Sequence, residues 1–158
     1  MKIRNIEEQD NKALAKMIRG ILTEYGINKP GTVFTDPTTD NLFALFQKKN
    51  SDYWVAELDG EIVGGCGIYP TTGLPNGCIE LVKLYVDPRA RGFGLGKKLM
   101  ALSIKEAERI GYTSIYLETL PALSDALGLY QKLGFKLLDF PLGSSGHFAC
   151  NIWMVKNM

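Results

Sequence analysis

Residues 80–98 read ELVKLYVDPRARGFGLGKK. The first part belongs to a predicted strand over residues 78–86, which Asp87-Pro88 ends, and a helical pattern follows from Leu95. Three glycines at alternate positions, 92, 94 and 96, permit a tight turn whose backbone N–H groups converge. The helix N-terminus directly after the turn adds positive dipole character. The stretch therefore predicts a strand, an anion-binding turn suited to a pyrophosphate, and a helix.

Other nucleotide-binding turns fit these residues less well. Dinucleotide-binding folds use a similar turn, but they place it after the first strand of a parallel βαβ unit. Here about half of the chain precedes the turn, including a hairpin at Asp59-Gly60. The Walker pattern fails because no Gly-Lys-Ser or Gly-Lys-Thr occurs. A loop that serves only packing would not need the flanking basic residues Arg89, Arg91, Lys97 and Lys98.

Apolar periodicity and turn residues predict the elements on either side of this stretch. The elements before it are a strand over 2–6, helices over 11–25 and 36–49, and strands over 53–58 and 61–69. The elements after the turn are a helix over 95–110, a strand over 114–118, a helix over 124–133, and strands over 136–140 and 148–155. This order predicts one mixed α/β domain over residues 1–158.

Composition and charge narrow the class of protein. Hydrophobic residues make up 46% and charged residues 22% of the 158, as in soluble globular domains. No apolar run reaches the ~18 residues of a membrane span, and residues 1–10 lack the apolar centre of a secretory signal, so a cytoplasmic location without membrane association is expected. The net charge of +1 provides no field to attract nucleic acid. Three widely spaced cysteines and one histidine predict neither a disulfide framework nor a metal site.

Two motifs resemble landmarks of the GNAT superfamily of N-acetyltransferases. RGFGLG at 91–96 is similar to its acetyl-CoA signature, Gln/Arg-x-x-Gly-x-Gly/Ala, and ALGLYQKLGF at 126–135 resembles Ala-x-x-Leu-Tyr-x-Lys-x-Gly-Phe. The motifs occur in the family's order, separated by one predicted strand. The resemblance implies an α/β fold with a mixed, mostly antiparallel, twisted sheet of about seven strands, flanked by about four helices. Its strands would splay at the acetyl-CoA site.

The resemblance also implies how the cosubstrate acetyl-CoA is held. Backbone amides of the turn, with Lys97, would bind the pyrophosphate, and a strand segment would pair with the pantetheine arm. The implied cofactor-binding residues are Leu84, Tyr85, Val86, Arg91, Gly92, Phe93, Gly94, Leu95, Gly96 and Lys97. Many relatives carry a pantetheine-binding Asn where this chain has Leu123. That contact would be missing here or supplied by another group, such as Ser124.

The family's reaction is direct attack of a neutral amine on the thioester, which requires a group that accepts the amine's proton. By resemblance, Glu80 is the base, directly or through a water, and Glu118 is the alternative. Tyr130 matches the family tyrosine that protonates the departing thiolate. A backbone N–H near Val86 would polarise the thioester carbonyl. The implied catalytic residues are therefore Glu80 and Tyr130.

The acceptor is expected to be a small-molecule amine such as an amino acid, a polyamine or a drug-like amine. Its expected contacts are Tyr25, Phe34, Glu118 and His147, of which His147 is also a weaker alternative for the base. A protein lysine or N-terminal acetyltransferase, a non-catalytic acetyl-CoA-binding module and a dinucleotide oxidoreductase stay open as alternatives. The small size of the chain favours a small acceptor. Dimers are common in the family, and residues 148–155 are expected to form an exposed edge at which a homodimer could assemble.

Overall fold

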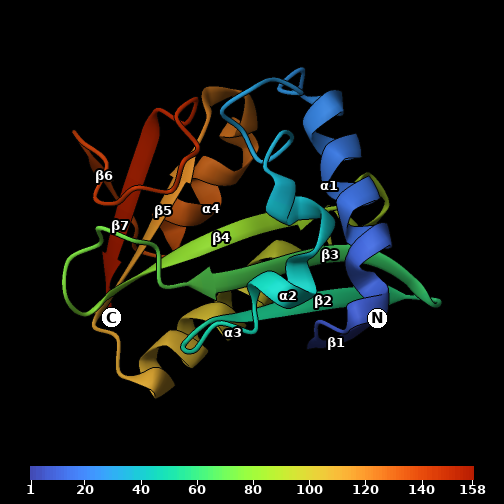
Figure 1. Cartoon of the computed structure of the whole chain (residues 1–158), viewed down its shortest axis with the longest axis horizontal. Helices are drawn as coiled ribbons and strands as arrows, with labels where there is room; N and C mark the ends of the chain where they lie inside the picture. The colour runs from blue at the N-terminus through green and yellow to red at the C-terminus, as the bar shows by residue number, and fades with distance from the viewer.

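A computed structural model describes all residues, 1–158. It contains one seven-stranded sheet in the order β1-β2-β3-β4-β5-β7-β6, seen in Figure 1. All neighbouring strands are antiparallel except β4 and β5, which are parallel. The strands are β1 (Lys2–Asn5), β2 (Asp52–Leu58), β3 (Glu61–Tyr69), β4 (Cys78–Val86), β5 (Ser114–Thr119), β6 (Lys136–Leu138) and β7 (Ile152–Asn157). The predicted mixed, mostly antiparallel sheet is confirmed.

Helices cover both faces of the sheet. The first face carries α1 (Asn11–Glu24) and α2 (Leu42–Leu45), and the other carries α3 (Leu95–Ile110) and α4 (Leu127–Lys132), as Figure 1 shows. Alternate residues of β2 serve the two cores, since Tyr53 and Val55 pack on the α1 side and Trp54 and Ala56 on the α3 side. Short 3₁₀ turns are η1 (Glu8–Asp10), η2 (Pro37–Asp40), η3 (Pro88–Ala90) and η4 (Pro121–Ala126). None of the helices combines the length and apolarity that a membrane crossing requires.

Several boundaries agree with the sequence because local turn chemistry sets them. β3, β4 and α3 have exactly the predicted limits. Asp59 and Gly60 adopt φ of 52° and 84°, the left-handed pair of a tight hairpin turn between β2 and β3. Gly111 ends α3 with φ 105°. This left-handed conformation favours glycine, because a residue with a Cβ would be strained there. The predicted helix over 11–25 and strand over 2–6 are also confirmed to within one residue.

Two predicted helices are shorter and interrupted. The helix expected over 36–49 is wrong: η2 is followed by the single turn of α2, because Asn41 adopts non-helical φ −142° and ψ 66° and its side chain caps α2. Asp36 does cap the first of these pieces, as its side chain accepts from the N–H of Thr38. The helix expected over 124–133 begins instead as a 3₁₀ turn, with a kink at Leu123, and only α4 is α-helical.

The last strand is displaced from its predicted position. Residues 148–151 are not part of β7, because Ala149 donates its N–H to Gly31 O and Cys150 donates to His147 O. The expected exposed edge over 148–155 is also wrong, since β7 lies between β5 and β6 and pairs with both. The edge strand is β6, which ends at Leu138 rather than at residue 140.

The sheet opens between its two parallel strands. β4 and β5 pair only over Cys78–Ser114, Ile79–Ile115 and Glu80–Tyr116. Beyond Glu80, β4 has no strand partner on that side. Figure 1 shows β4 continuing with β1, β2 and β3 while β5 and β7 turn steeply away. The predicted splay of the strands is therefore present, and it leaves a wedge-shaped opening at the centre of the sheet.

A β-bulge lies in β4 just inside this opening. Gly65 of β3 faces Tyr85 and Gly67 faces Val82, so Lys83 and Leu84 together lie opposite one residue of β3. Lys83 has φ 53°, a left-handed conformation that lysine rarely adopts. An extra residue of this kind bends the strand and changes the direction of the side chains that follow.

Tyr53 holds the bulge from the neighbouring strand. Its side chain is fully buried, and its hydroxyl donates to Lys83 O at 3.0 Å. The ring occupies space that two glycines leave open, because a Cβ on Gly65 or Gly67 would lie within 2.4 Å or 2.6 Å of the Tyr53 side chain. The glycines of β3 therefore permit the tyrosine, and the tyrosine satisfies the carbonyl that the bulge exposes.

Replacing Gly67 with alanine tests this arrangement. The new Cβ would lie 2.6 Å from both Asp52 O and the Tyr53 ring, so we expect Gly67→Ala to lower the free energy of unfolding by about 1–3 kcal/mol through overpacking. Urea denaturation measures this change. Gly20→Ala is the control, since Gly20 lies in α1 with open space around it, and it should raise stability by up to about 1 kcal/mol. A Gly67→Ala protein as stable as wild type would contradict the close packing described.

Candidate active site

The glycine-rich turn after β4 presents a row of unsatisfied backbone donors. Gly92 and Gly94 adopt φ of 82° and 73°, and Gly94 is the N-cap of α3. No carbonyl or side chain of the protein accepts a hydrogen bond from the N–H groups of residues 92–97. Most of these residues are exposed, so their N–H groups are accessible to a ligand, and the dipole of α3 adds positive potential at the same place. The turn therefore fits an anionic group such as the pyrophosphate of acetyl-CoA.

The basic side chains around the turn divide into two kinds. Arg89 forms ion pairs with Glu61 and Asp87. Arg91 forms an ion pair with Glu24 of α1 and donates a hydrogen bond to Val86 O. Lys97 and Lys98 are exposed and form no ion pair. The lysines are thus the free cations at the turn, whereas the arginines fix its position.

A cavity of about 550 Å³ occupies the opening between β4 and β5. It brings together both expected catalytic residues and four of the expected binding residues: Glu80, Tyr130, Leu84, Tyr85, Glu118 and His147 all line it, as does Leu123. Val86 and the glycine-rich turn over residues 91–97 lie outside its lining. Two expected acceptor contacts lie elsewhere. Tyr25 stacks under the Arg91 guanidinium at 5.4 Å and donates to Asp125, and Phe34 contributes its carbonyl to Arg19. Neither Tyr25 nor Phe34 lines the cavity.

Glu80 stands at the point where β4 leaves β5. Its side chain is buried and accepts a short hydrogen bond from the Thr71 hydroxyl. Burial, reinforced by the charge of Glu118, raises the pKa of Glu80 to about 7. A carboxyl group with such a pKa exchanges a proton readily near neutral pH, which is the property required of a general base.

Glu118 is held more tightly than Glu80. It accepts hydrogen bonds from the hydroxyls of Tyr116, at 2.8 Å, and Ser145, at 2.7 Å. These two hydrogen bonds fix the direction of its carboxyl group. Glu118 lines the same cavity as Glu80.

Tyr130 enters the cavity from α4. Its ring packs against Phe135 with centroids 6.1 Å apart, and no protein group hydrogen-bonds its hydroxyl. Burial raises the pKa of Tyr130 above its ordinary value, so the hydroxyl keeps its proton at neutral pH. The side chain thus presents an O–H donor without a protein acceptor in the cavity that Leu84 and Tyr85 also line.

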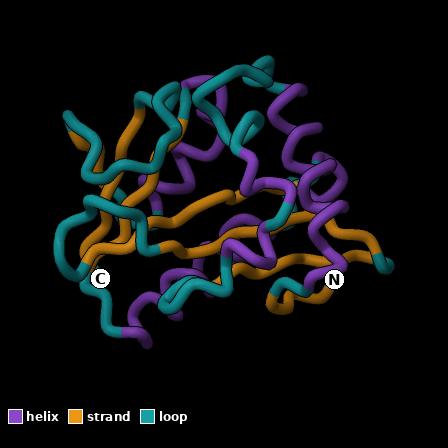
Figure 2. Tube along the Cα trace, viewed as in Figure 1, coloured by secondary structure: helices purple, strands orange, loops and turns teal.

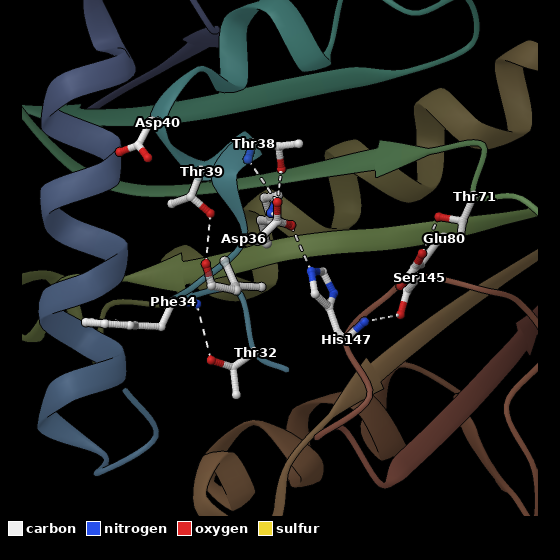
Figure 3. A network of polar contacts seen from close by, with 12 residues as sticks. Thr32, Phe34, Asp36, Thr38, Thr39, Asp40, Thr71, Glu80, Ser145 and His147 are labelled. Atoms are coloured by element: carbon white, nitrogen blue, oxygen red, sulfur yellow. Dashed lines mark hydrogen bonds and ion pairs between the residues drawn. The ribbon is translucent and has the colours of Figure 1, made fainter. Parts of the chain in front are cut away.

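An ionic cluster that the sequence did not predict lies at the other end of the cavity. His147 Nε2 is 2.9 Å from Asp36 Oδ2, and Lys83 Nζ is 3.3 Å from the same oxygen. The backbone N–H and hydroxyl of Thr38 donate to Asp36 Oδ1. Figure 3 shows His147 pointing at Asp36, with Thr38 on its far side. Although burial favours the neutral acid, these donors and the Lys83 charge hold the pKa of Asp36 below its usual range.

The sequence contained a weak signal for this cluster. Asp36 is only the first residue of the helix predicted over 36–49, and Lys83 is the one basic residue inside a strand that is otherwise largely apolar. A cation in the middle of such a strand is typical of a buried ion pair or a functional site. Its partner could not be predicted because Asp36 is 47 residues away in the chain.

The loop between β6 and β7 crosses the cavity as a strap, which we define as residues 141–150. Ser144 donates its N–H to Thr72 O on one side, and Ala149 donates to Gly31 O on the other. The Phe148 ring packs on Gly31, where a Cβ would lie 2.4 Å from it. Figure 2 shows this loop beside the loop that follows α1. The strap, which connects β6 to β7, is therefore fastened to two loops that precede β4 in the chain.

Solved structures share this architecture. An acetyltransferase of the GNAT family from Staphylococcus aureus Mu50 superimposes with a TM-score of 0.87 over 99% of this chain and 98% of its own, at 24% identity. The PaiA N-acetyltransferase of Thermoplasma acidophilum, solved in complex with coenzyme A, gives 0.74 over 99% and 98%, at 20% identity. At these identities the likeness demonstrates the fold alone.

Sequence comparison identifies the family. The Acetyltransferase (GNAT) family model matches residues 17–135. An Escherichia coli K12 protein named uncharacterized N-acetyltransferase YjgM is 40% identical over 99% of this chain and 94% of its own length. Human N-acetyltransferase 8B is 33% identical over 68% of this chain, which spans about half of that longer protein (51%). The chain therefore belongs to the GNAT family of acetyltransferases and is an acyltransferase.

Proposed function

We propose that this acyltransferase moves the acetyl group of acetyl-CoA to a primary amine of a small molecule. The observation that carries the proposal is the single cavity, at the opening between β4 and β5, that contains both Glu80 and Tyr130. With its pKa raised to about 7, Glu80 accepts a proton near neutral pH, whereas Tyr130, whose pKa is raised by burial, retains its proton. Amine acylation by a thioester needs both kinds of group, one on each side of the reacting carbon.

Several features support acetyl-CoA as the cosubstrate. The unpaired N–H groups of residues 92–97 suit its pyrophosphate. The side of β4 that β5 leaves free suits an extended pantetheine arm bound as an added strand over residues 84–86. Solved relatives of the same fold include the PaiA protein and an aminoglycoside 6'-N-acetyltransferase, both in complex with coenzyme A.

The residues then divide the proton transfers between them. Bound acetyl-CoA supplies an activated acyl carbon, as a thioester. Glu80 accepts, directly or through a water, the proton that the amine loses as its nitrogen bonds to that carbon. Tyr130 donates its proton to the sulfur as the carbon–sulfur bond breaks. A backbone N–H of the bulged segment near Val86 stabilises the negative charge on the carbonyl oxygen.

The strap favours a small acceptor over a polypeptide. It is fastened to Thr72 in the loop between β3 and β4 and to Gly31 in the loop after α1. Its Ser145 and His147 side chains contact the carboxylates of Glu118 and Asp36, which line the cavity. The space beneath it is about 550 Å³, within the range of small-molecule sites. An extended peptide would require an open groove at this place.

An assay of thiol release from acetyl-CoA tests the proposal across a panel of small amines, a lysine-containing peptide and a protein N-terminal peptide. We expect release with at least one small amine and not with the peptides. If only the peptides gave thiol release, the acceptor would be a protein and the proposed small-molecule acceptor would be wrong. If calorimetry on the folded protein detected no heat of binding with acetyl-CoA or CoA, the cosubstrate assignment would be overturned.

Substituting Gly94 tests the anion-binding turn. Gly94 has φ 73°, which a β-branched residue cannot adopt without strain, so Gly94→Val should distort the turn and weaken CoA binding at least about tenfold. Isothermal calorimetry measures the affinity. Gly20→Val is the control because Gly20 has open space and ordinary helical φ in α1, and it should bind like wild type. Unchanged affinity in Gly94→Val would show that the turn does not hold the cosubstrate.

Removing the Tyr130 hydroxyl tests the proton donor. Tyr130→Phe keeps the ring packed on Phe135 and deletes only the O–H. We expect kcat to fall about 10-fold to 100-fold, the lower range for loss of a general acid, with little change in the Kd for acetyl-CoA. Steady-state kinetics and calorimetry measure the two quantities. An unchanged kcat would remove Tyr130 from the mechanism.

The pH dependence tests Glu80. Because the pKa of Glu80 is raised to about 7, the protonated and inactive form dominates below pH 7 and the basic form above it. The wild-type rate should therefore rise with pH and bend near pH 7. Glu80→Gln should lower the rate and lose the bend, whereas Glu118→Gln should retain it. A bend that persists in Glu80→Gln would assign the titration to another group.

A further inference from the structure

The bulge in β4 places Lys83 on the same side of the sheet as Glu80. In a regular strand, residues three apart point to opposite faces. Here Val82 packs on the α1 side and Leu84 on the α3 side, and the extra residue between them, Lys83 with φ 53°, turns its side chain to the α1 side. Both Lys83 and Glu80 consequently line the cavity.

Lys83 is buried with part of its hydrogen-bonding capacity unused. Its side chain is only 4% exposed, and its sole hydrogen-bond partner is Asp36 Oδ2, at a long 3.3 Å. An ammonium group carries three N–H donors, and donors buried without acceptors are costly. Burial accordingly lowers the pKa of Lys83. The remaining donors of Lys83 are therefore available to an acceptor atom inside the cavity.

Asp36 does not provide acceptors for all three N–H donors of Lys83, because its oxygens also accept hydrogen bonds from other groups. It accepts from the N–H and the hydroxyl of Thr38, and it also contacts His147 and Lys83. Figure 3 shows Thr38 and His147 on two sides of the Asp36 carboxylate. The Asp36 carboxylate is thus shared among Lys83, His147 and the two donors of Thr38. A second anion beside Lys83 would meet a cation that is only partly compensated.

The charges around the cavity are arranged in two poles. Glu80 and Glu118 form the acidic pole at the point where β4 and β5 separate. Lys83 forms the basic pole three residues farther along β4. Lys48 also lines the cavity, but it is exposed and lies over the Tyr69 ring at 4.9 Å. A ligand with one cationic and one anionic end matches this arrangement.

We propose that the acceptor is an amino carboxylate whose amine faces Glu80 and whose carboxylate is bound by the Lys83 ammonium. This proposal rests on the acetyl transfer proposed above. Acetylation forms the amide nitrogen–carbon bond and leaves the carboxylate unchanged, so Lys83 contacts substrate and product alike. A polyamine would instead bring a second cation toward Lys83, where like charges repel.

The test compares acceptors that differ only at the carboxylate. Thiol release is measured with α-amino acids and with their carboxamides, which keep the amine and the side chain. We expect wild-type kcat/KM to be about 10-fold to 100-fold higher for the acid of the preferred pair, the range for hydrogen bonds between charged groups. Preference for the carboxamides, or for polyamines over every amino acid, would overturn the proposal.

An amino acid and its carboxamide also differ in the basicity of the amine. Variants of the protein separate this difference from the effect of the carboxylate contact. Lys83→Gln should reduce the ratio of kcat/KM for acid over carboxamide about tenfold relative to wild type. Lys48→Gln removes the same charge from the rim of the cavity and should keep the wild-type ratio. An unchanged ratio in a folded Lys83→Gln protein, checked by thermal unfolding, would contradict the role of Lys83.

If the Lys83→Gln protein fails to fold, product inhibition of the wild-type protein tests the same contact. N-acetylated amino acids should inhibit at least about tenfold more strongly than N-acetylated carboxamides, because the product retains its carboxylate contact. Equal inhibition by the two products would overturn the proposal. Failure of the underlying acetyl transfer has a different signature, namely no thiol release with any amine.

Discussion

The parting of β4 from β5 after Glu80 is the constraint on which the site depends. Three paired positions hold the two halves of the sheet together, and beyond them the backbone of β4 lacks a neighbour. A sheet edge of this kind normally attracts another strand, but here it borders a cavity about 550 Å³ in volume. The same divergence lets side chains from β4, β5 and α4 line one space, so the proposed proton acceptor Glu80 and the proposed proton donor Tyr130 share a cavity although they come from distant segments.

The interior of this opening contains charges that a folded protein usually avoids. Glu80 and Lys83 are both buried, and each is retained because a specific partner or a ligand compensates its burial. Tyr53 belongs to the same structure, since its hydroxyl satisfies the carbonyl of the bulged Lys83. Glycines 65 and 67 provide the room for its ring. Backbone strain, small residues and buried charges thus concentrate at one place, as is common at functional sites.

Local chemistry explains which parts of the chain were predictable. The hairpin at Asp59-Gly60 and the limits of α3 follow from left-handed residues next to periodic segments, and both were predicted correctly. Residues 36–49 and 148–155 were predicted wrongly because specific hydrogen bonds, some local and some to other segments, override their apolar pattern. Asn41 breaks the first by capping α2. Residues of the second donate backbone N–H groups to Gly31 O and His147 O, so these groups cannot join the ladder of β7.

The sequence by itself determined the family and the glycine-rich turn before α3, and it indicated the two residues proposed for proton transfer, because these depend on short motifs with fixed spacing. Only the tertiary structure decided the pairing of Lys83 with Asp36, the closure of the strap over the cavity and the exclusion of Tyr25 and Phe34 from it. These features join residues that are far apart in the chain. Their positions depend on the bulge and on loop packing, for which a single sequence carries no periodic signal.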